Sequence, residues 1–92
     1  MYKIQYTHRM KHDAKLMQKQ GKDMQDLIDA LNLLATGKPM PEKYKDHQLG
    51  GNLKDLRECH IAPDWILMYK RDEDKLILLA IATGSHSGLL KL

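Results

Sequence analysis

Five histidines stand out in this chain of 92 residues, because imidazole can both accept and donate a proton near neutral pH. Three of them, His47, His60 and His86, follow loop or strand-like segments, where they could converge at one edge of a sheet. Asp64 follows His60 across a proline turn, so both side chains are expected at the same end of adjacent strands. These residue types suit acid–base catalysis. Simple neutralisation of charge within the turn is the alternative interpretation of His60 and Asp64.

Basic and aromatic side chains accompany these histidines in the sequence. Phosphate binding needs cationic donors, and Lys45, Lys54 and Arg57 lie in the same region. Arg57 is the best suited of the three to a bidentate contact with a phosphate group. Trp65 begins a β-rich segment and has two interpretations, a core residue or a platform on which an RNA base stacks.

His8 and His12 form a separate pair, four residues apart near the start of a predicted helix. This spacing is compatible with two ligands of a metal site. The sequence specifies neither a third ligand nor a supporting carboxylate, so we predict no metal and no other cofactor. We also expect both residues to lie outside the catalytic group.

Hydrophobic periodicity predicts a short strand followed by two helices. Residues 2–6 alternate about Ile4, which favours a strand. Residues 9–20 form a basic amphipathic helix preceded by Thr7, and residues 24–35 form a second helix preceded by Asp23. Because the link between the helices is short, we expect an antiparallel hairpin.

The sequence pattern in the second half of the chain predicts a loop followed by a sheet. Residues 37–52 contain glycines and prolines, which interrupt helices and strands, so they are expected to form the loop. Three β-rich segments follow at 53–61, 65–71 and 75–83, and their short connections favour an antiparallel meander. The last segment is apolar on both faces, so we expect a central strand there, and Leu89 and Leu90 are expected in a short helical turn.

Length and composition bound the class of protein. A chain of 92 residues that is 42% hydrophobic and 29% charged is expected to form a single domain over residues 1–92. Its longest apolar run, residues 76–82, is too short to cross a bilayer. The single cysteine, Cys59, forms no internal disulfide, which favours a reducing cytoplasmic location without membrane partners. The net charge of +3 permits a nucleic-acid partner without requiring one.

Several motifs together resemble one known family. In chain order they are Tyr44-Lys45-Asp46-His47, Leu49-Gly50, Leu56-Arg57, His60, Pro63-Asp64-Trp65-Ile66-Leu67, Tyr69-Lys70 and Thr83-Gly84-Ser85-His86. The combined pattern, which spans nearly the whole chain, resembles the YafQ branch of the RelE/ParE superfamily of bacterial toxins. The resemblance implies an α+β, RelE-like βααβββ fold, with a helix hairpin on a small, twisted, mainly antiparallel sheet.

The same resemblance implies a function and a set of partners. It implies the toxin of a type II toxin–antitoxin pair, a ribosome-dependent endoribonuclease that cleaves mRNA and binds a cognate antitoxin. The positions matching the family's site are His47, His60, Asp64 and His86. Leu90 stands where some relatives have an aromatic residue.

RNA cleavage without a metal explains why such residues are needed. One group must take the proton of the ribose 2′-hydroxyl, and another must protonate the leaving 5′-oxygen, while cations stabilise the phosphorane. We assign these proton transfers to His86 and to His60 with Asp64, and the positioning of phosphate to His47 with Arg57. Two alternatives are a ParE-like topoisomerase inhibitor without hydrolytic activity and a non-enzymatic RNA-binding module.

Overall fold

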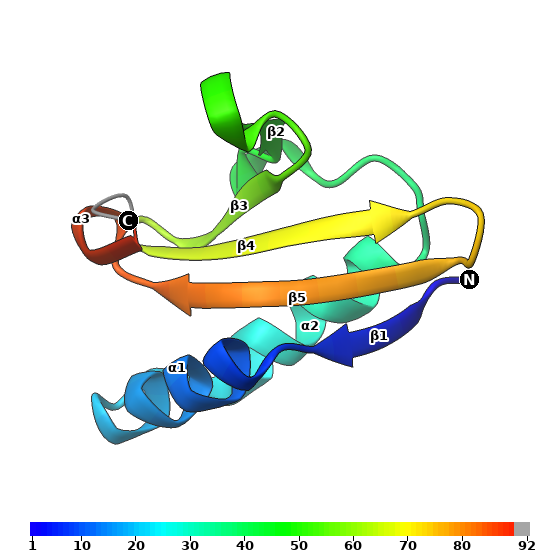
Figure 1. The fold of residues 1–92 in the computed structure, drawn as a ribbon. Helices are drawn as coiled ribbons and strands as arrows, with labels where there is room; N and C mark the ends of the chain where they lie inside the picture. The colour runs from blue at the N-terminus through cyan, green and yellow to red at the C-terminus, as the bar shows by residue number, and fades with distance from the viewer. Residues whose placement is uncertain (90–92) are drawn as a thin grey trace.

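The computed structural model describes residues 1–89 and shows an α+β fold (Figure 1). The elements in chain order are β1 (Lys3–Tyr6), α1 (His8–Lys19), α2 (Met24–Ala35), the 3-10 helix η1 (Glu42–Tyr44), β2 (His47–Gln48), the 3-10 helix η2 (Gly51–Leu53), β3 (Arg57–Ala62), β4 (Trp65–Asp72), β5 (Ile77–Gly84) and α3 (His86–Leu89). This confirms the predicted order of a strand, two helices, a meander and a helical turn. Leu90 lies outside the described residues.

Both long helices begin at the capping residues expected from the sequence. The Thr7 hydroxyl accepts a hydrogen bond from the Met10 N–H at 2.9 Å, and the Asp23 carboxylate accepts one from the Gln25 N–H at 2.9 Å. Such caps stabilise a helix by about 0.5–2 kcal/mol. The Thr7 hydroxyl also donates to the Ile81 carbonyl at 2.6 Å, which attaches the start of α1 to β5.

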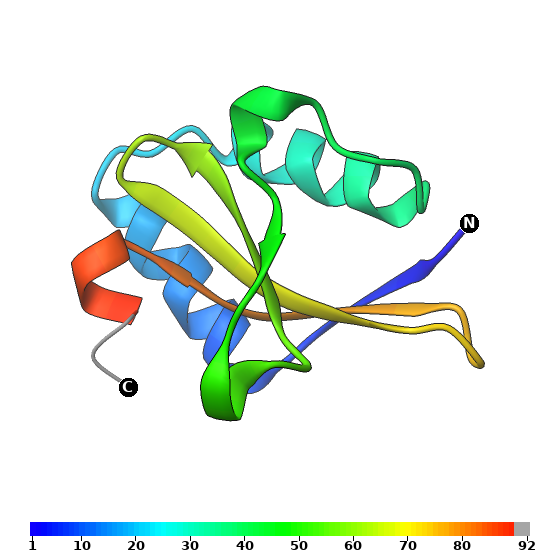
Figure 2. The ribbon, with the colours of Figure 1, turned by 90° about the horizontal axis from the view of Figure 1, so that it is seen from above.

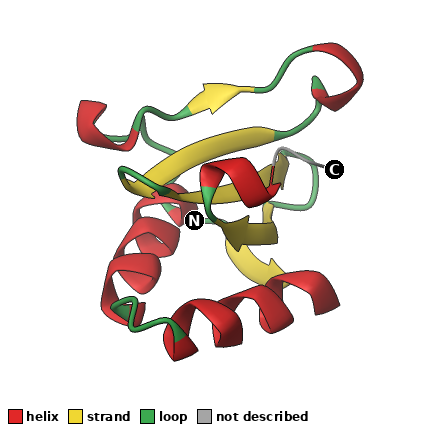
Figure 3. Cartoon of the chain, turned by 90° about the vertical axis from the view of Figure 1, so that its left-hand side faces the viewer, coloured by secondary structure: helices red, strands yellow, loops and turns green. Residues whose placement is uncertain are grey.

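A short turn joins the two helices, as predicted, and both helices contribute to the same core cluster against the sheet. Helix α1 lies along β5, whereas α2 contacts β1 and β3, and the two helices leave their connecting turn in different directions (Figure 3). The predicted pair of helices packed on the sheet is therefore confirmed, and each helix buries its apolar stripe against the sheet.

The sheet has the strand order β1-β5-β4-β3-β2. Strands β3, β4 and β5 form the predicted antiparallel meander, and β5 lies inside the sheet between β4 and β1. Strand β1 pairs with β5 in parallel, with Lys3 opposite Ile77. The two-residue strand β2 pairs with the start of β3 inside the segment predicted as a loop.

Side-chain alternation divides the sheet into two faces. The face covered by the helices carries the larger core, to which the sheet contributes Cys59, Leu67, Tyr69, Leu78 and Ala80. The opposite face, here called the histidine face, carries a smaller cluster in which Leu89 of α3 packs with residues of β4 and β5. Helix α3 lies at the end of the sheet where β4 begins and β5 ends (Figures 1 and 2). None of the described helices is long and apolar enough to cross a membrane.

Candidate active site

His60 and His86 come together on the histidine face. His60 of β3 pairs with Ile66 of β4, and Ile66 pairs in turn with Gly84 of β5, so these three residues form a row across the sheet. His86 lies two residues beyond Gly84, at the start of α3. As a result, the His60 and His86 ring centroids are 6.1 Å apart, with the ring planes inclined at 32°. This confirms that the two histidines share one face of the sheet.

Trp65 and Thr83 fix the end of β5 from which His86 follows. The Trp65 Nε1–H donates to Thr83 Oγ1 at 2.8 Å, and that hydroxyl donates to the Ile66 carbonyl at 2.7 Å. The Thr83 N–H donates to the Asp13 carboxylate of α1 at 3.2 Å. Because Trp65 is only 1% exposed, its ring offers no face to an RNA base. The core interpretation of Trp65 is therefore confirmed, and its base-stacking role is withdrawn.

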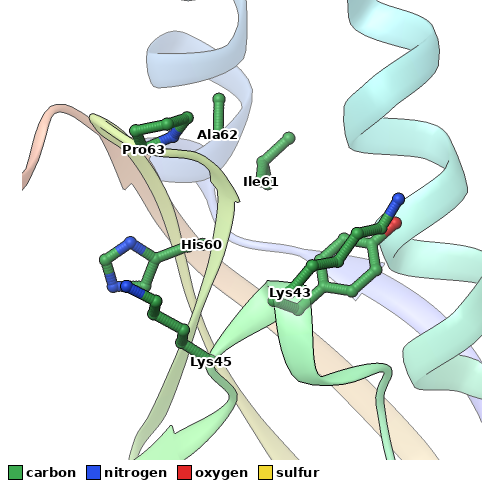
Figure 4. Close-up of a pocket in the computed structure, with 7 residues that line it drawn as sticks. Lys43, Lys45, His60, Ile61, Ala62 and Pro63 are labelled. Atoms are coloured by element: carbon green, nitrogen blue, oxygen red, sulfur yellow. The ribbon is translucent and has the colours of Figure 1, made fainter.

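A hollow of about 380 Å³ lies beside His60, over the part of β3 that extends beyond β2. Its lining residues are Lys43, Tyr44, Lys45, His60, Ile61, Ala62 and Pro63. The Lys45 side chain extends toward the His60 ring (Figure 4). Lys45 follows η1 in the left-handed backbone region, with φ of 48°. An ammonium group thus stands beside an imidazole at the rim of an open hollow.

His47 is held by hydrogen-bonding groups at both ring nitrogens. Its Nδ1 lies 2.7 Å from the Lys45 carbonyl oxygen, and because a carbonyl only accepts, Nδ1 carries the proton. Its Nε2 lies 3.1 Å from Glu58 Oε1. The Glu58 side chain is 3% exposed, whereas that of His47 is 49% exposed. The arrangement fixes the imidazole at the surface with a buried carboxylate beneath it.

Glu58 is the site residue that the sequence analysis missed. It lies two positions before His60 in β3, and alternate residues of a strand project from the same face. The available signal was therefore the Glu-x-His spacing within a predicted strand. A buried carboxylate costs free energy unless it is paired, so its retention beside His47 indicates a role in orienting that ring.

Arg57 and Lys54 do not join this group. Arg57 lies three positions before His60 in β3, so its side chain projects from the opposite face. There its Nη2 lies 3.2 Å from Asp46 Oδ2, and its Nε donates to the Tyr69 hydroxyl at 3.3 Å. Burial acts to lower the Arg57 pKa, but the hydrogen bonds to Tyr69 and Asp46 outweigh it and raise the pKa. Lys54 follows η2, away from the hollow, and shares a different depression with Arg57.

Asp64 is exposed in the turn between β3 and β4. Among the described residues, no hydrogen bond or ion pair joins its carboxylate to His60, four positions earlier in the chain. His8 and His12 are exposed on α1, outside the catalytic group as predicted. Within residues 1–89, no cluster of three or more His, Cys, Asp or Glu side chains is arranged to hold a metal ion.

The histidine face therefore presents groups suited to moving protons at a phosphodiester. The two imidazole rings are close enough for one phosphate group to contact both, because a hydrogen bond to each ring spans about 2.7–3.2 Å. Lys45 adds a cation beside His60, and Glu58 holds His47 nearby. Such groups can supply a base, an acid and charge stabilisation.

Comparison with known proteins identifies the family of this chain. Residues 2–91 match the family model of the bacterial toxin of type II toxin–antitoxin systems, YafQ. The mRNA interferase toxin YafQ of Escherichia coli is 44% identical over 87 residues, which cover 94% of this chain and 92% of that protein.

Solved structures agree in both fold and extent. The toxin in the crystal structure of the Escherichia coli DinJ–YafQ complex is 39% identical, with a TM-score of 0.87 and coverage of 97% of this chain and 98% of that one. A metal-bound toxin from Helicobacter pylori is 40% identical, with a TM-score of 0.90 and coverage of 97% and 99%. The chain therefore belongs to the YafQ family of bacterial toxins of type II toxin–antitoxin systems.

Proposed function

We propose that this toxin cleaves mRNA on the ribosome by acid–base catalysis at the histidine face. Family membership makes the chain an endoribonuclease, and the relatives' name, mRNA interferase, supports mRNA as the substrate. The observation that carries the mechanism is the approach of His60 and His86 to 6.1 Å. Two imidazoles at this separation can act on opposite sides of one scissile phosphate.

The reaction needs two proton transfers, one for each of the two histidines. One of His60 and His86 takes the proton of the 2′-hydroxyl, whose oxygen then attacks phosphorus. The other gives a proton to the 5′-oxygen as the P–O bond breaks, which leaves a cyclic phosphate and a 5′-hydroxyl. Each such proton transfer contributes about 10²- to 10⁴-fold in rate. The route uses side chains of this chain and needs no metal ion.

The remaining polar groups position the substrate. Lys45 neutralises charge on the phosphate as the phosphorane forms, a role that the sequence analysis gave to Arg57. His47, oriented by Glu58, presents its exposed ring edge to the RNA backbone. Asp64 stands in the turn beside His60 and supports that imidazole in the bound complex.

The proposed partner is a cognate antitoxin, and the site is proposed to act in the cytoplasm. A relative is found in the DinJ–YafQ complex, and this chain carries a net charge of +3. We expect the antitoxin segment that covers the toxin to be acidic or to form an apolar helix. Expression of the toxin alone should stop growth, and co-expression with its antitoxin should restore growth.

Mapping of RNA 5′ ends tests this function. Purified toxin is added to translating ribosomes and, separately, to the same mRNA without ribosomes. New ends that require ribosomes support the proposal. Ends produced equally without ribosomes contradict ribosome dependence, and ribosome binding without new ends favours the RNA-binding module. Inhibition of a topoisomerase with mRNA left intact favours the ParE-like alternative.

A further inference from the structure

Asp46 lies between two site residues in the sequence but projects away from the histidine face. Its neighbours Lys45 and His47 carry their side chains toward His60 and Glu58. The Asp46 carboxylate instead reaches the helix-covered side of the sheet, where the Tyr69 hydroxyl donates to Oδ1. Arg57 Nη2 donates to Oδ2 at 3.2 Å. Both carboxylate oxygens are therefore held by residues of the central sheet.

These contacts form a closed triangle, here called the Asp46 anchor and made of Asp46, Arg57 and Tyr69. Arg57 Nε also donates to the Tyr69 hydroxyl, at 3.3 Å. Arg57 and Tyr69 are direct partners in the β3–β4 register, so the sheet itself sets their separation. Tyr69 is completely buried, and the Asp46 side chain is 15% exposed. Hydrogen bonds to a charged group in such surroundings are stronger than those between exposed neutral groups.

The Tyr69 hydroxyl of the anchor holds its proton more tightly than a free tyrosine does. Burial, followed by the hydrogen bond to Asp46, raises the pKa of Tyr69. The hydroxyl therefore remains a donor to the carboxylate.

The segment that carries Lys45 and His47 needs such an attachment. Strand β2 pairs with β3 through only two residue pairs, His47 with Glu58 and Gln48 with Arg57. Lys45 has a φ of 48°, in the left-handed backbone region that residues other than glycine seldom adopt without support from the surrounding structure. The Asp46 carboxylate and the His47 ring lie on opposite sides of the sheet, bound to Arg57 and Glu58 respectively. Holding Asp46 on one side therefore fixes the backbone from which His47 projects on the other side.

We propose that Asp46 is a positioning residue, which through Arg57 and Tyr69 holds Lys45 and His47 in their working orientation on the histidine face. The inference rests on the proposed function for the meaning of that orientation. Its geometric part concerns the His47 ring and can be measured without RNA. In particular, the anchor holds the Lys45 carbonyl in place as the acceptor of the His47 Nδ1–H.

Tyr69→Phe is the sharpest test, because it removes one hydroxyl and retains the buried ring. Tyr2→Phe is the matched control, since the Tyr2 hydroxyl also donates to a carboxylate, that of Glu73, away from the histidine face. We expect Tyr69→Phe to lower the single-turnover cleavage rate at saturating mRNA by about tenfold or more. Tyr2→Phe should keep the parental rate.

Nitrogen NMR of the histidine rings supplies a second readout, which a loss of stability alone does not move. In the parent, the His47 Nδ1–H should appear as a hydrogen-bonded proton. In Tyr69→Phe, that proton should exchange faster with water and its signal should weaken, while the His12 ring keeps its parental signals. Asp46→Asn, which retains an acceptor, should lose less activity than Asp46→Ala. Adding Tyr69→Phe to Asp46→Ala should cost little more than Asp46→Ala alone.

The outcomes separate this inference from the proposed function. An unchanged His47 signal in Tyr69→Phe overturns the positioning role, whether the rate falls or not. A parent that never cleaves mRNA overturns the proposed function, while the His47 signal still decides whether Asp46 positions that ring. A changed signal together with a parental cleavage rate overturns the link between the anchor and catalysis.

Discussion

The three histidines of the site differ in what holds their rings. Hydrogen-bonding groups of the described residues occupy both ring nitrogens of His47, whereas His60 and His86 stand beside each other with their ring nitrogens available. A proton-transfer group needs a nitrogen that can reach the substrate. His60 and His86 are therefore the proposed acid–base pair, and His47 is a ring held in place by the Lys45 carbonyl and Glu58.

His86→Ala should lower mRNA cleavage by at least about 10²-fold, the lower range for loss of a general acid or base. His86 is exposed at the first position of α3 and contributes little packing. The free energy of unfolding of the His86→Ala variant should therefore differ from that of the parent by no more than about 0.5 kcal/mol. Single-turnover cleavage and urea denaturation of the same preparation measure the two quantities.

His12→Ala is the matched control, because it removes an exposed histidine of α1. It should leave both the cleavage rate and the stability at parental values. A folded His86→Ala variant that cleaves mRNA at the parental rate would remove His86 from the mechanism.

Strand parity explains which site residues the sequence could predict. His60 and Glu58 share a face because they are two positions apart, and Arg57 faces the other way because it is three positions from His60. Parity applied to the predicted strand would have paired Glu58 with the histidines and removed Arg57. The approach of His86 to His60 depends on the β4–β5 register, which a local pattern does not contain.

Strand β5 is the element on which both sides of the molecule depend. Its Leu78 and Ala80 pack into the helix-covered core, while its far end leads into His86. Helix α1, β1 and β4 all contact this strand. Truncating a buried side chain of β5 should therefore destabilise the core and disturb the site together.

Leu78→Ala should destabilise the fold by about 2–5 kcal/mol, the range for truncating a fully buried leucine. Leu78 has 0% of its surface exposed. Urea denaturation measures the loss, and cleavage should fall in proportion to the unfolded fraction. Leu76→Ala is the control, since Leu76 is 50% exposed and its truncation should cost much less. Equal losses in the two variants would contradict the assignment of β5 as a central core strand.

Among the helices and strands, the sequence predicted those that hydrophobic periodicity specifies. Helix α2 was predicted with its observed bounds, because its apolar spacing, its Asp23 cap and the stop at Gly37 agree. Strand β2 was missed, since two paired residues have no measurable alternation. The parallel pairing of β1 with β5 joins segments more than 70 residues apart, which no local signal specifies.

The whole molecule separates its stabilising core from its proposed chemistry. The helices and the larger apolar cluster cover one face, and His47, His60 and His86 lie on the other. Cys59 belongs to the core, where burial raises the pKa of its thiol to about 12. A thiol of this kind stays protonated and unreactive at neutral pH.

Stability should consequently fall at alkaline pH. The folded state holds the Cys59 proton more tightly than the unfolded state, so its stabilising contribution is full below pH 9 and is lost as the pH rises to about 12. The loss from this group should approach about 1.4 kcal/mol per pH unit. Urea denaturation across this range should show a shallower decline for Cys59→Ala, whatever its stability at neutral pH. Equal slopes would contradict the raised thiol pKa.

The chemical nature of the cleaved RNA ends tests the central claim most directly. Translating ribosomes are mixed with parental toxin, and the ends of the mRNA fragments are analysed. Attack by the 2′-hydroxyl with proton transfer through His60 and His86 predicts a 2′,3′-cyclic phosphate on the upstream fragment and a 5′-hydroxyl on the downstream fragment. Fragments bearing 3′-hydroxyls and 5′-phosphates would contradict acid–base catalysis by the histidine face.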